Sequence, residues 1–433
     1  MKFRVLTSAV AITAVSAFYV PANGTVEYVD PAVAAELSTV MPRPVNSAES
    51  TYFVFTDRYA NGSEDNDYGG GNFQYGFDPS SLYQFHGGDF LGLTANLARL
   101  QRLGFTSIWV TPPVANDTGG YHGYWGLDFT RVDPHLGTNA QFKAFVDAAH
   151  AKGMKVIMDI VVNHTADVIR YEGSNDRTFY NLADTPYKDA DGNAFDLASR
   201  TGLDSCTAIG QFGCFPLLDN RTYVYGDPAN KSFPHQFTQS ATVELLKPDF
   251  LQDPSNYHNR GDATDCGWAP GDCQMFGDFM GLDDVFTEKP QVVQGWIDTY
   301  AAWVTNFGVD GFRFDTAKHV NPEFWDAFIP AMNAAAAAAG KPTELTMFSE
   351  AWIEDPYALA EWYRNNAPES VLDFASQVTF TKFAAGYSNG SAMLNLLSRD
   401  DYFNTGNKPG VVRNAYGLTT FLGNHDMGRG NAM

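Results

Sequence analysis

The chain is 433 residues long, with 44% hydrophobic and 18% charged residues, which is the composition of an ordinary globular protein. This length exceeds what one hydrophobic core usually holds, so we expect a large barrel with an inserted or second domain. The 28 basic residues against 50 acidic ones give a net charge of −22, which argues against nucleic acid and against an anionic membrane as a partner.

The N-terminal segment predicts export. Lys2 and Arg4 precede a mostly apolar run from 5 to 20, and this pattern indicates a signal peptide over residues 1–22. Residues 23–50 show no clear period and are interpreted as a leader and linker. No other stretch has the length of a membrane span. From the signal-peptide pattern we expect a secreted or periplasmic protein.

The four cysteines form two close pairs in the sequence, Cys206 with Cys214 and Cys266 with Cys273. Two short-loop disulfides suit an exported protein, and pairing between sequence neighbours is favoured among the three connectivities. The alternative is a zinc site made of all four thiolates, although the spacings are wide for a zinc ribbon.

Strand and helix patterns alternate over residues 51–164. Strands are predicted at 52–56, 105–110 and 155–162. A first helix has Leu93, Leu97, Leu100 and Leu103 on its inner face and ends at Gly104. A second helix over 139–152 has Phe142, Phe145, Val146 and Ala149 on its inner face. This spacing indicates βαβ units and a parallel sheet.

The alternation stops over residues 165–284, which are rich in Asp, Asn and Gly and contain all four cysteines. A structureless loop of this length is improbable inside a barrel, so we expect an inserted domain with two disulfides. The pattern resumes over 285–433, with helices predicted at 290–306 and 322–339 and strands near 309–314, 345–348, 371–374 and 417–422. Seven strands result, the first three before the insertion. We therefore expect a (β/α)8-type TIM barrel truncated before its eighth strand and lacking a C-terminal β-domain.

Polar residues follow the strand near 309–314. Arg313 and Asp315 are two residues apart, so their side chains lie on the same face of a strand. A cation so close would keep Asp315 ionised at neutral pH. Taken alone, the pair could equally be a structural ion pair.

Three further strands end in the same way. The four polar clusters lie at 159–164, 311–319, 348–352 and 421–426. With these four motifs in order, the sequence resembles the α-amylase family of glycoside hydrolases from Tyr52 to the C-terminus. One departure is Ser349, where the family usually has Gly before the catalytic Glu.

The resemblance implies three catalytic acids. Asp315 is expected to be the nucleophile, Glu350 the general acid/base, and Asp426 the acid that binds sugar hydroxyls. Retaining cleavage requires one ionised and one protonated carboxyl. Glu350 lies between Phe348 and Trp352, where desolvation would raise its pKa.

The resemblance also implies sugar contacts. His164, His425 and Arg313 match positions that bind the sugar before the cleaved bond, and Lys318 and His319 match positions just beyond it. The loop after the second strand resembles the family's sugar-stacking loop through Tyr121, His122, Tyr124 and Trp125. The alternative for this loop is an aromatic segment that packs on the barrel.

The resemblance implies calcium as the cofactor, and oxygen ligands of this kind suit such a hard cation. The family's structural site corresponds to Asn163, Asp284 and the His319 carbonyl, with an extra acid at Asp283 as a departure. A second set of residues resembles the additional calcium loop of some members of the family, and it comprises Asn61, Ser63, Asn66, Asp67, Gly87 and Asp89. The alternative for this second set is an Asn/Asp-rich turn.

The sequence thus predicts a monomeric, retaining, endo-acting hydrolase of α-1,4-glucosidic bonds in starch-like glucans. A cyclodextrin-forming or other α-glucan transferase is the rival, because the same acids serve both reactions. A non-catalytic glucan-binding relative is the alternative from another class of protein, and it is disfavoured because all three acids are present.

Overall fold

The computed structural model describes residues 49–69, 76–171, 177–188, 194, 235, 237–239, 242–341, 345–366, 370–398 and 415–427. They belong to one compact unit, residues 49–433. The predicted signal peptide, nearly all of the linker, the Cys206/Cys214 pair and most of 189–241 lie outside the described residues.

A parallel sheet forms the centre of this unit. Its strands, in spatial order, are β1 (Thr51–Val54), β2 (Ser107–Val110), β5 (Lys155–Ile160), β8 (Gly311–Phe314) and β9 (Thr346–Ser349). Two parallel bridges extend the order, from Ser349 to Val371 and from Leu372 to Thr419. All seven predicted strand positions therefore pair in chain order, although the last two are single bridges among the residues described.

Alternation along the strands separates two faces. The outer face, with residues such as Ile108, Phe312 and Met347, belongs to the large hydrophobic core shared with the helices. The inner face has its own apolar cluster, which includes Trp109 and Phe348. The residues between the outer-face positions therefore point to the inner face. They include polar residues near the strand ends, such as Asp159 and Arg313.

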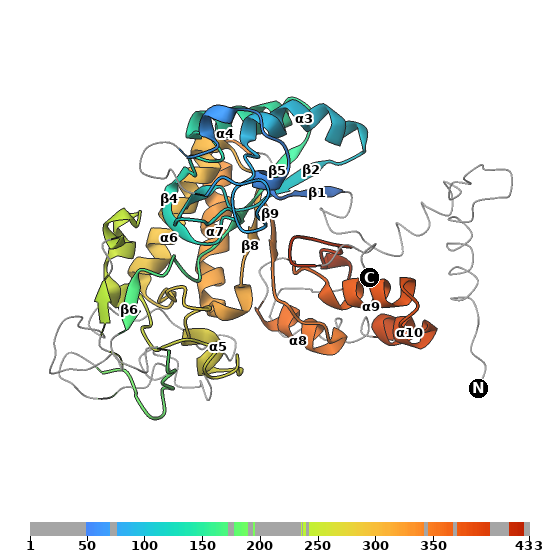
Figure 1. Ribbon diagram of the computed structural model, residues 1–433. Helices are drawn as coiled ribbons and strands as arrows, with labels where there is room; N and C mark the ends of the chain where they lie inside the picture. The colour runs from blue at the N-terminus through green and yellow to red at the C-terminus, as the bar shows by residue number, and fades with distance from the viewer. Residues whose placement is uncertain are drawn as a thin grey trace, which may run out of the picture. The chain divides into compact units, whose positions relative to one another are not determined.

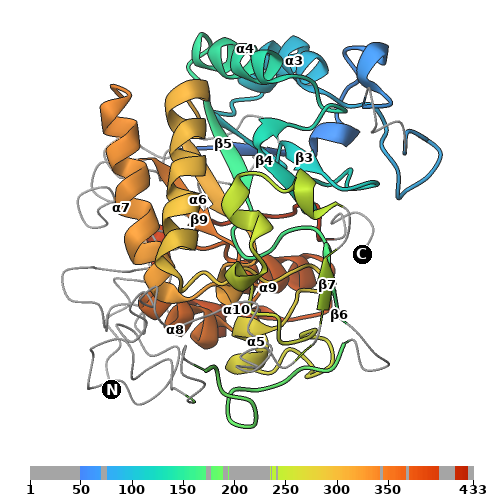
Figure 2. The ribbon, with the colours of Figure 1, turned by 90° about the vertical axis from the view of Figure 1, so that its left-hand side faces the viewer.

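Helices cover the outer face. The paired helices are α3 (Phe90–Arg102) with α4 (Asn139–His150), and α6 (Pro290–Ala302) with α7 (Pro322–Ala338), as Figures 1 and 2 show. A π-helical turn, Trp303–Phe307, continues α6 and ends at Gly308, whose φ is +83°. The inner face of α4 is buried as predicted. Leu103 departs from the prediction, because it lies past the end of α3 and is 61% exposed.

Three helices follow β9 that the sequence did not predict. They are α8 (Pro356–Asn366), α9 (Phe374–Ala384) and α10 (Gly390–Ser398), with a small apolar core of their own. Leu394 and Leu397 of α10 are exposed, so its apolar residues do not mark one buried stripe. The predicted strand at 371–374 was too long, because α9 begins at Phe374, and the strand predicted at 417–422 is reduced to the bridge at Thr419.

Along the chain, shorter elements lie between the strands of the central sheet. An antiparallel pair, β3 (Val114–Asn116) and β4 (Gly126–Val132), carries the aromatic loop at its tip. A second pair, β6 (Ile169–Tyr171) with β7 (Phe237–Gln239), and the helix α5 (Asp272–Phe276) lie between β5 and β8. The 3₁₀ helices are Thr56–Arg58, Glu64–Asn66, Val243–Leu245, Asp249–Gln252, Pro254–Asn256, Ala317–His319 and Ala415–Gly417.

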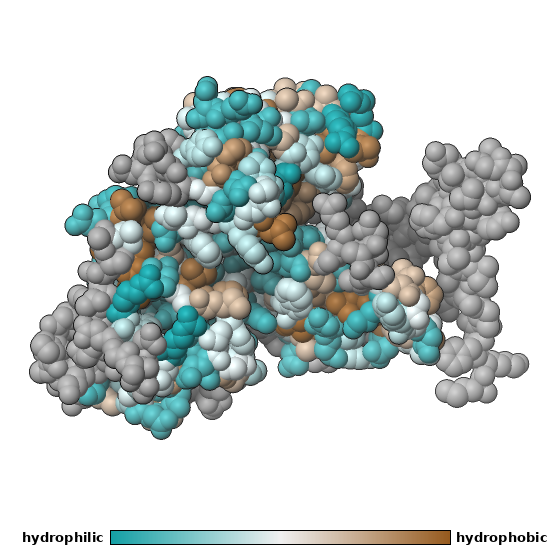
Figure 3. All heavy atoms as spheres, viewed as in Figure 1, coloured by the Kyte–Doolittle hydropathy of each residue, from teal (hydrophilic) through white to brown (hydrophobic). Residues whose placement is uncertain are grey.

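The predicted bond between Cys266 and Cys273 is present, with their Cα atoms 6.1 Å apart. This pairing rules out the four-thiolate zinc site. The boundaries of an inserted domain at 165–284 remain a prediction. No helix within the described ranges is long and apolar enough to span a membrane. On the face shown in Figure 3, hydrophobic residues form separate small patches among hydrophilic ones.

Candidate active site

Arg313 lies at the centre of the polar cluster on the inner face. The β8 strand places it opposite Asp159 of β5 and Phe348 of β9. Its Nη1 atom is 2.9 Å from Asp159 Oδ1 and 2.5 Å from Asp315 Oδ1. Its Nη2 atom is 3.9 Å from Glu350 Oε2. One fully buried guanidinium therefore contacts three carboxylates, of which Asp315 was the one predicted from the spacing.

Asp159 is a neighbour of Arg313 for which the sequence predicted no role. Its second carboxylate oxygen accepts hydrogen bonds from Trp109 Nε1 at 3.1 Å and from the Tyr124 hydroxyl at 2.9 Å. Burial raises the pKa of Asp159 to about 7, and the adjacent Arg313 opposes this shift. Asp159 thus ties β2, the aromatic loop and Arg313 together. Its position opposite Arg313 depends on strand register, which no local motif reveals.

Glu350 follows β9 and faces the end of β8. Its Oε2 atom accepts a hydrogen bond from the backbone N–H of Thr316 at 3.1 Å. Burial raises the pKa of Glu350 to about 7, against the opposing charge of Arg313, and the charges of Asp315 and Asp426 add to the rise. The predicted desolvation of Glu350 is therefore found. The departure at Ser349 is accommodated, because its hydroxyl donates to the Ser370 carbonyl at 3.0 Å.

Asp426 and His425 come from the segment after the bridge at Thr419. His425 Nε2 is 3.4 Å from Asp426 Oδ2, and burial raises the pKa of Asp426. The His425 ring stacks on the Tyr124 ring, with centroids 5.3 Å apart and an interplanar angle of 10°. Burial, with Arg313 nearby, lowers the pKa of His425 to about 3, so the ring is neutral. The structure therefore brings this third acid to the same cluster.

The aromatic loop divides into two parts. Tyr124 reaches Asp159 and His425, and the backbone N–H of Tyr124 donates to His122 Nδ1 at 3.0 Å. Burial lowers the pKa of His122 to about 4. Tyr121 instead lies under the guanidinium of Arg58, 4.3 Å from its ring centroid, and Trp125 packs edge-on against His122. Of the two tyrosines, Tyr124 is the one in the cluster of acids.

The remaining predicted sugar contacts lie around these acids. His164 Nε2 is 3.2 Å from the Tyr124 carbonyl oxygen, and burial lowers the pKa of His164. Lys318 Nζ donates to the Trp352 carbonyl at 3.3 Å. His319 Nδ1 donates to the Gln274 carbonyl at 2.7 Å, and burial lowers the pKa of His319 to about 4. Lys318 and His319 thus lie in the segment that runs beside Glu350.

The second candidate calcium site fits the chemistry of a hard cation. Asn61 Nδ2 donates to Asp67 Oδ1 at 2.7 Å, and the Asn66 Oδ1 atom is buried without a partner. A Cβ on Gly87 would lie 2.5 Å from Asp67 Oδ1, so this cradle needs glycine. The backbone N–H of Ser63 donates a hydrogen bond to Asp89 Oδ2. The Asp89 side chain also caps the N-terminus of α3. Oxygen atoms dominate this donor set, as calcium prefers.

At the first candidate calcium site, His258 competes with a metal ion for the Asp284 carboxylate. The Asn163 side chain lies close enough to the Asp284 carboxylate to oppose the rise in its pKa, and the Asn163 carbonyl accepts from the Val285 N–H at 2.7 Å, so these two predicted ligands lie near each other. However, Asp284 Oδ2 is 2.5 Å from His258 Nδ1, and His258 Nε2 is 3.0 Å from Glu288 Oε2. Burial opposes protonation of His258, but Glu288 and Asp284 outweigh it and raise its pKa to about 9. The oxygen donors suit calcium, with His258 competing for one of them.

Across the part of the chain that the structure describes, no group of three or more His, Cys, Asp or Glu side chains is arranged to hold a metal ion. Calcium would therefore depend on amide and carbonyl oxygens in addition to carboxylates. At these sites it would supply a structural link between chain segments.

The fold and the cluster together define a class of protein. A parallel sheet with helices on its outer face, and acids at the carboxyl ends of neighbouring strands, is the arrangement of barrel-type α/β proteins whose sites lie on that rim. The comparisons with known proteins name the family. Residues 53–433 match the family model described as alpha amylase, catalytic domain, and the chain belongs to the α-amylase family.

Individual relatives agree with this assignment. An α-amylase of Streptomyces lividans is 41% identical over 364 residues, covering 82% of this chain and 36% of the relative. A cyclomaltodextrin glucanotransferase of Klebsiella oxytoca is 27% identical and covers 88% of this chain and 50% of the relative. The crystal structure of an Anoxybacillus α-amylase matches with a TM-score of 0.61 and 26% identity, covering 90% of this chain and 64% of that one. The chain spans about a third to a half of the length of these curated relatives.

Proposed function

We propose that this chain is the catalytic part of a retaining glycoside hydrolase that cleaves α-1,4-glucosidic bonds within starch-like glucans. The single observation that carries the proposal is that Arg313 contacts Asp315 at 2.5 Å and Glu350 at 3.9 Å, so two carboxyls share one guanidinium. Membership of the α-amylase family supports the substrate class.

In the first step, a carboxylate oxygen of Asp315 attacks the anomeric carbon while Glu350 gives its proton to the glycosidic oxygen. The bond between that carbon and oxygen breaks, and the leaving sugar departs. In the second step, ionised Glu350 takes a proton from water, whose oxygen attacks the same carbon and releases Asp315. Each step inverts the configuration at the anomeric carbon, so the two steps together retain it.

The environment of each acid supports its role. Asp315 is ion-paired with Arg313 at 2.5 Å, as a nucleophile requires. The pKa of Glu350 is raised to about 7 mainly by burial, which suits a group that must both give and take a proton near neutral pH. Asp426 and the neutral rings of His122 and His425 would bind hydroxyl groups of the reacting sugar, with the Tyr124 ring beneath it.

Export is part of the proposal. The pattern of residues 1–22 is that of a signal peptide, and the Cys266–Cys273 disulfide suits an oxidising compartment. A relative 30% identical over 340 residues is named a periplasmic α-amylase of Escherichia coli (strain K12).

A second candidate function is transfer of the glycosyl unit to a sugar instead of water. The matches to cyclomaltodextrin glucanotransferases favour it, because their chains cover 88% of this one. Chromatography of the products from starch separates the two, since a transferase of this kind yields cyclic sugars and a hydrolase yields linear ones.

The proposed function is tested with Glu350→Gln and a matched control, Glu361→Gln, at an exposed position of α8. We expect Glu350→Gln to lose starch hydrolysis by at least about 10²-fold, since general acid catalysis contributes this much, while glucan binding persists. The control should keep full activity. Proton NMR of the fresh product should show the α-anomer. Unchanged release of reducing sugar by Glu350→Gln would overturn the mechanism.

A further inference from the structure

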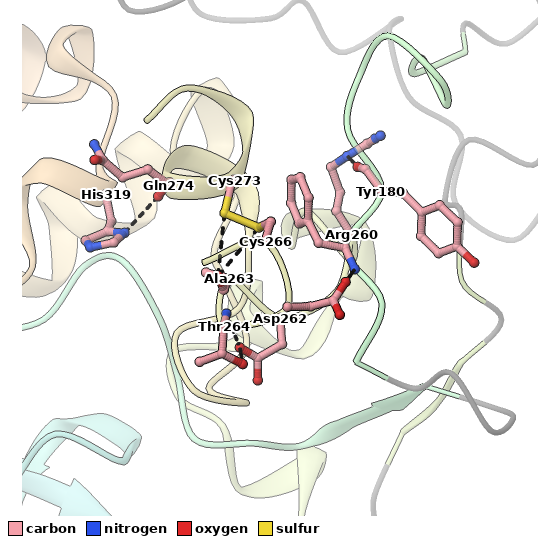
Figure 4. Close-up of a disulfide and its surroundings, with 11 residues drawn as sticks. Tyr180, Arg260, Asp262, Ala263, Thr264, Cys266, Cys273, Gln274 and His319 are labelled. Carbon is pink, nitrogen blue, oxygen red and sulfur yellow. Dashed lines mark hydrogen bonds between the residues drawn. A yellow bond between two sulfur atoms is a disulfide. The ribbon is translucent and has the colours of Figure 1, made fainter. Parts of the chain in front are cut away.

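The loop closed by the Cys266–Cys273 disulfide lies against the segment that runs beside Glu350. Figure 4 shows the disulfide, Gln274 and His319 together. Gln274 directly follows Cys273 within α5. Its carbonyl accepts from His319 Nδ1 at 2.7 Å, and its side-chain Nε2 donates to the Lys318 carbonyl at 2.6 Å. One residue thus fixes two neighbours through two different groups.

These bonds determine what His319 presents to a substrate. A carbonyl oxygen can only accept, so the Nδ1 atom of His319 carries the hydrogen. In a neutral ring, Nε2 is then left as an acceptor for a sugar hydroxyl. Gln274 therefore orients His319 and selects its tautomer, as an orienting group does for a catalytic histidine.

The same loop presents an aromatic ring. Trp268 lies between the two cysteines of the disulfide. Its backbone φ is +58°, in the left-handed region that bulky residues rarely adopt. The backbone N–H of Trp268 donates to the Ala263 carbonyl at 3.0 Å. Such a conformation is strained and persists only where surrounding structure imposes it. The short disulfide-closed loop is such a constraint.

The Trp268 ring joins the site through two contacts. Its centroid is 5.7 Å from that of His319 and 4.9 Å from that of Phe279. The Phe279 ring in turn lies 5.2 Å from His319 and stacks on His164 at 5.7 Å. Trp268 remains partly exposed, so the chain does not cover this residue completely.

The role of Glu350 as general acid indicates which side of the cleaved bond lies near Trp268. This acid gives its proton to the leaving sugar, so the leaving sugar lies beside it. The segment Thr316–His319 borders Glu350 through the Thr316 N–H, 3.1 Å from Glu350 Oε2, and Lys318 reaches the Trp352 carbonyl. Sugar units beyond the cleaved bond would therefore pass His319 and meet Trp268.

We propose that the Cys266–Cys273 loop builds the acceptor side of the cleft, with Trp268 as its sugar-stacking residue and Gln274 as a positioning residue for Lys318 and His319. This inference rests on the proposed function and adds to it a determinant of acceptor binding. It concerns the half of the substrate that leaves, or that enters as an acceptor in transfer.

Two substrates separate this role from a general structural one. Maltoheptaose fills positions on both sides of the cleaved bond, whereas α-maltotriosyl fluoride places only fluoride beyond it. For Trp268→Ala, we expect kcat/KM on maltoheptaose to fall by about tenfold, the value of one aromatic contact of ~1.4 kcal/mol. The fluoride should be hydrolysed as by the wild type, and Trp268→Phe should restore most of the loss. Tyr387→Ala, at an exposed aromatic after α9, is the control and should change neither substrate.

Gln274→Glu tests the positioning role, because it keeps the shape and removes the side-chain donor to Lys318. It should show the same selective loss on maltoheptaose. Gln101→Glu is the matched control, since Gln101 Nε2 likewise donates to a lysine carbonyl, that of Lys152, at 2.7 Å on α3. The double variant Cys266→Ser/Cys273→Ser should reproduce the selective loss. Equal losses on both substrates, or no loss on either, would overturn the inference.

A binding experiment keeps the inference separate from the proposed function. Calorimetry with maltoheptaose compares Glu350→Gln with Glu350→Gln/Trp268→Ala, and it requires no turnover. Weaker binding by the double variant supports the acceptor-side role, and equal affinity contradicts it. A wild-type chain that hydrolyses neither substrate would refute the hydrolase function, and the calorimetric comparison would still decide the role of Trp268.

Discussion

Burial raises the pKa of Glu350 to about 7, and Arg313 opposes the shift without cancelling it. The same guanidinium is held by Asp159, whose other oxygen is fixed by Trp109 and Tyr124. Two acids that share a guanidinium therefore have different surroundings, because Arg313 is 2.5 Å from Asp315 but 3.9 Å from Glu350. Such a difference is what separates an acid from a nucleophile at one pH.

The raised pKa predicts the alkaline side of the pH profile. A general acid acts in its protonated form, so kcat/KM on maltoheptaose should fall about tenfold per pH unit above the pKa near 7. Cleavage of α-maltotriosyl fluoride needs no proton for its leaving group, so its first step should lack this alkaline fall. Initial rates between pH 5 and 9 measure both. A maltoheptaose profile that stays flat to pH 9 would contradict the assignment of Glu350.

At the scale of elements, β8 contains Arg313 and is followed directly by Asp315. The strand is packed tightly between β5 and β9. Gly311 pairs with Ile157 of β5 and with Thr346 of β9. A Cβ at position 311 would lie 1.9 Å from the Thr346 carbonyl oxygen, which is backbone and cannot rotate away. The close approach of these strands therefore depends on the absence of a side chain.

Gly311→Ala should consequently destabilise the fold by about 3 kcal/mol or more, the upper end of overpacking costs. It should also lower activity, because β8 and β9 carry Asp315 and Glu350. Gly390→Ala is the control, since a Cβ there meets no atom within 4 Å at the start of α10. Urea unfolding of both variants provides the measurement. Equal stability of the two would show that the strands can separate at no cost.

At the scale of the whole molecule, the second calcium site would join the loop 61–67 to the segment 87–89 before α3. These segments already meet through Asn61, Asp67 and the Gly87 cradle. An ion that binds only the folded chain stabilises it by about 2.7 kcal/mol at a hundred times its Kd. Calcium would then act on stability and not on the chemistry of Glu350.

We therefore expect millimolar calcium to raise the midpoint of thermal unfolding and a chelator to reverse the effect. Asp67→Asn should lose much of the calcium-dependent increment, because Asp67 is buried at the candidate site. Asp65→Asn lies in the same loop at an exposed position and should keep the increment. Differential scanning calorimetry with and without calcium compares them. An identical increment in the Asp67 variant would remove this loop as a calcium site.

The sequence by itself determined the features that are local. The inner face of α4, the positions of the sheet strands along the chain and the polar residues that end them each depend on a short window of period and composition. Asp315, Glu350 and Asp426 could be predicted because the four polar clusters at the strand ends resemble the motifs of the α-amylase family. The exposed apolar residues of α10 gave no such period, so that helix was missed.

Only the tertiary structure decided which distant residues meet. Asp159 lies opposite Arg313 because of strand register, Tyr124 and not Tyr121 reaches the acids, and His258 contacts Asp284. The packing of Trp268 and Gln274 on His319 likewise joins segments about 45 residues apart. These contacts depend on sheet pairing and loop closure over long separations, and no local pattern of residues specifies them.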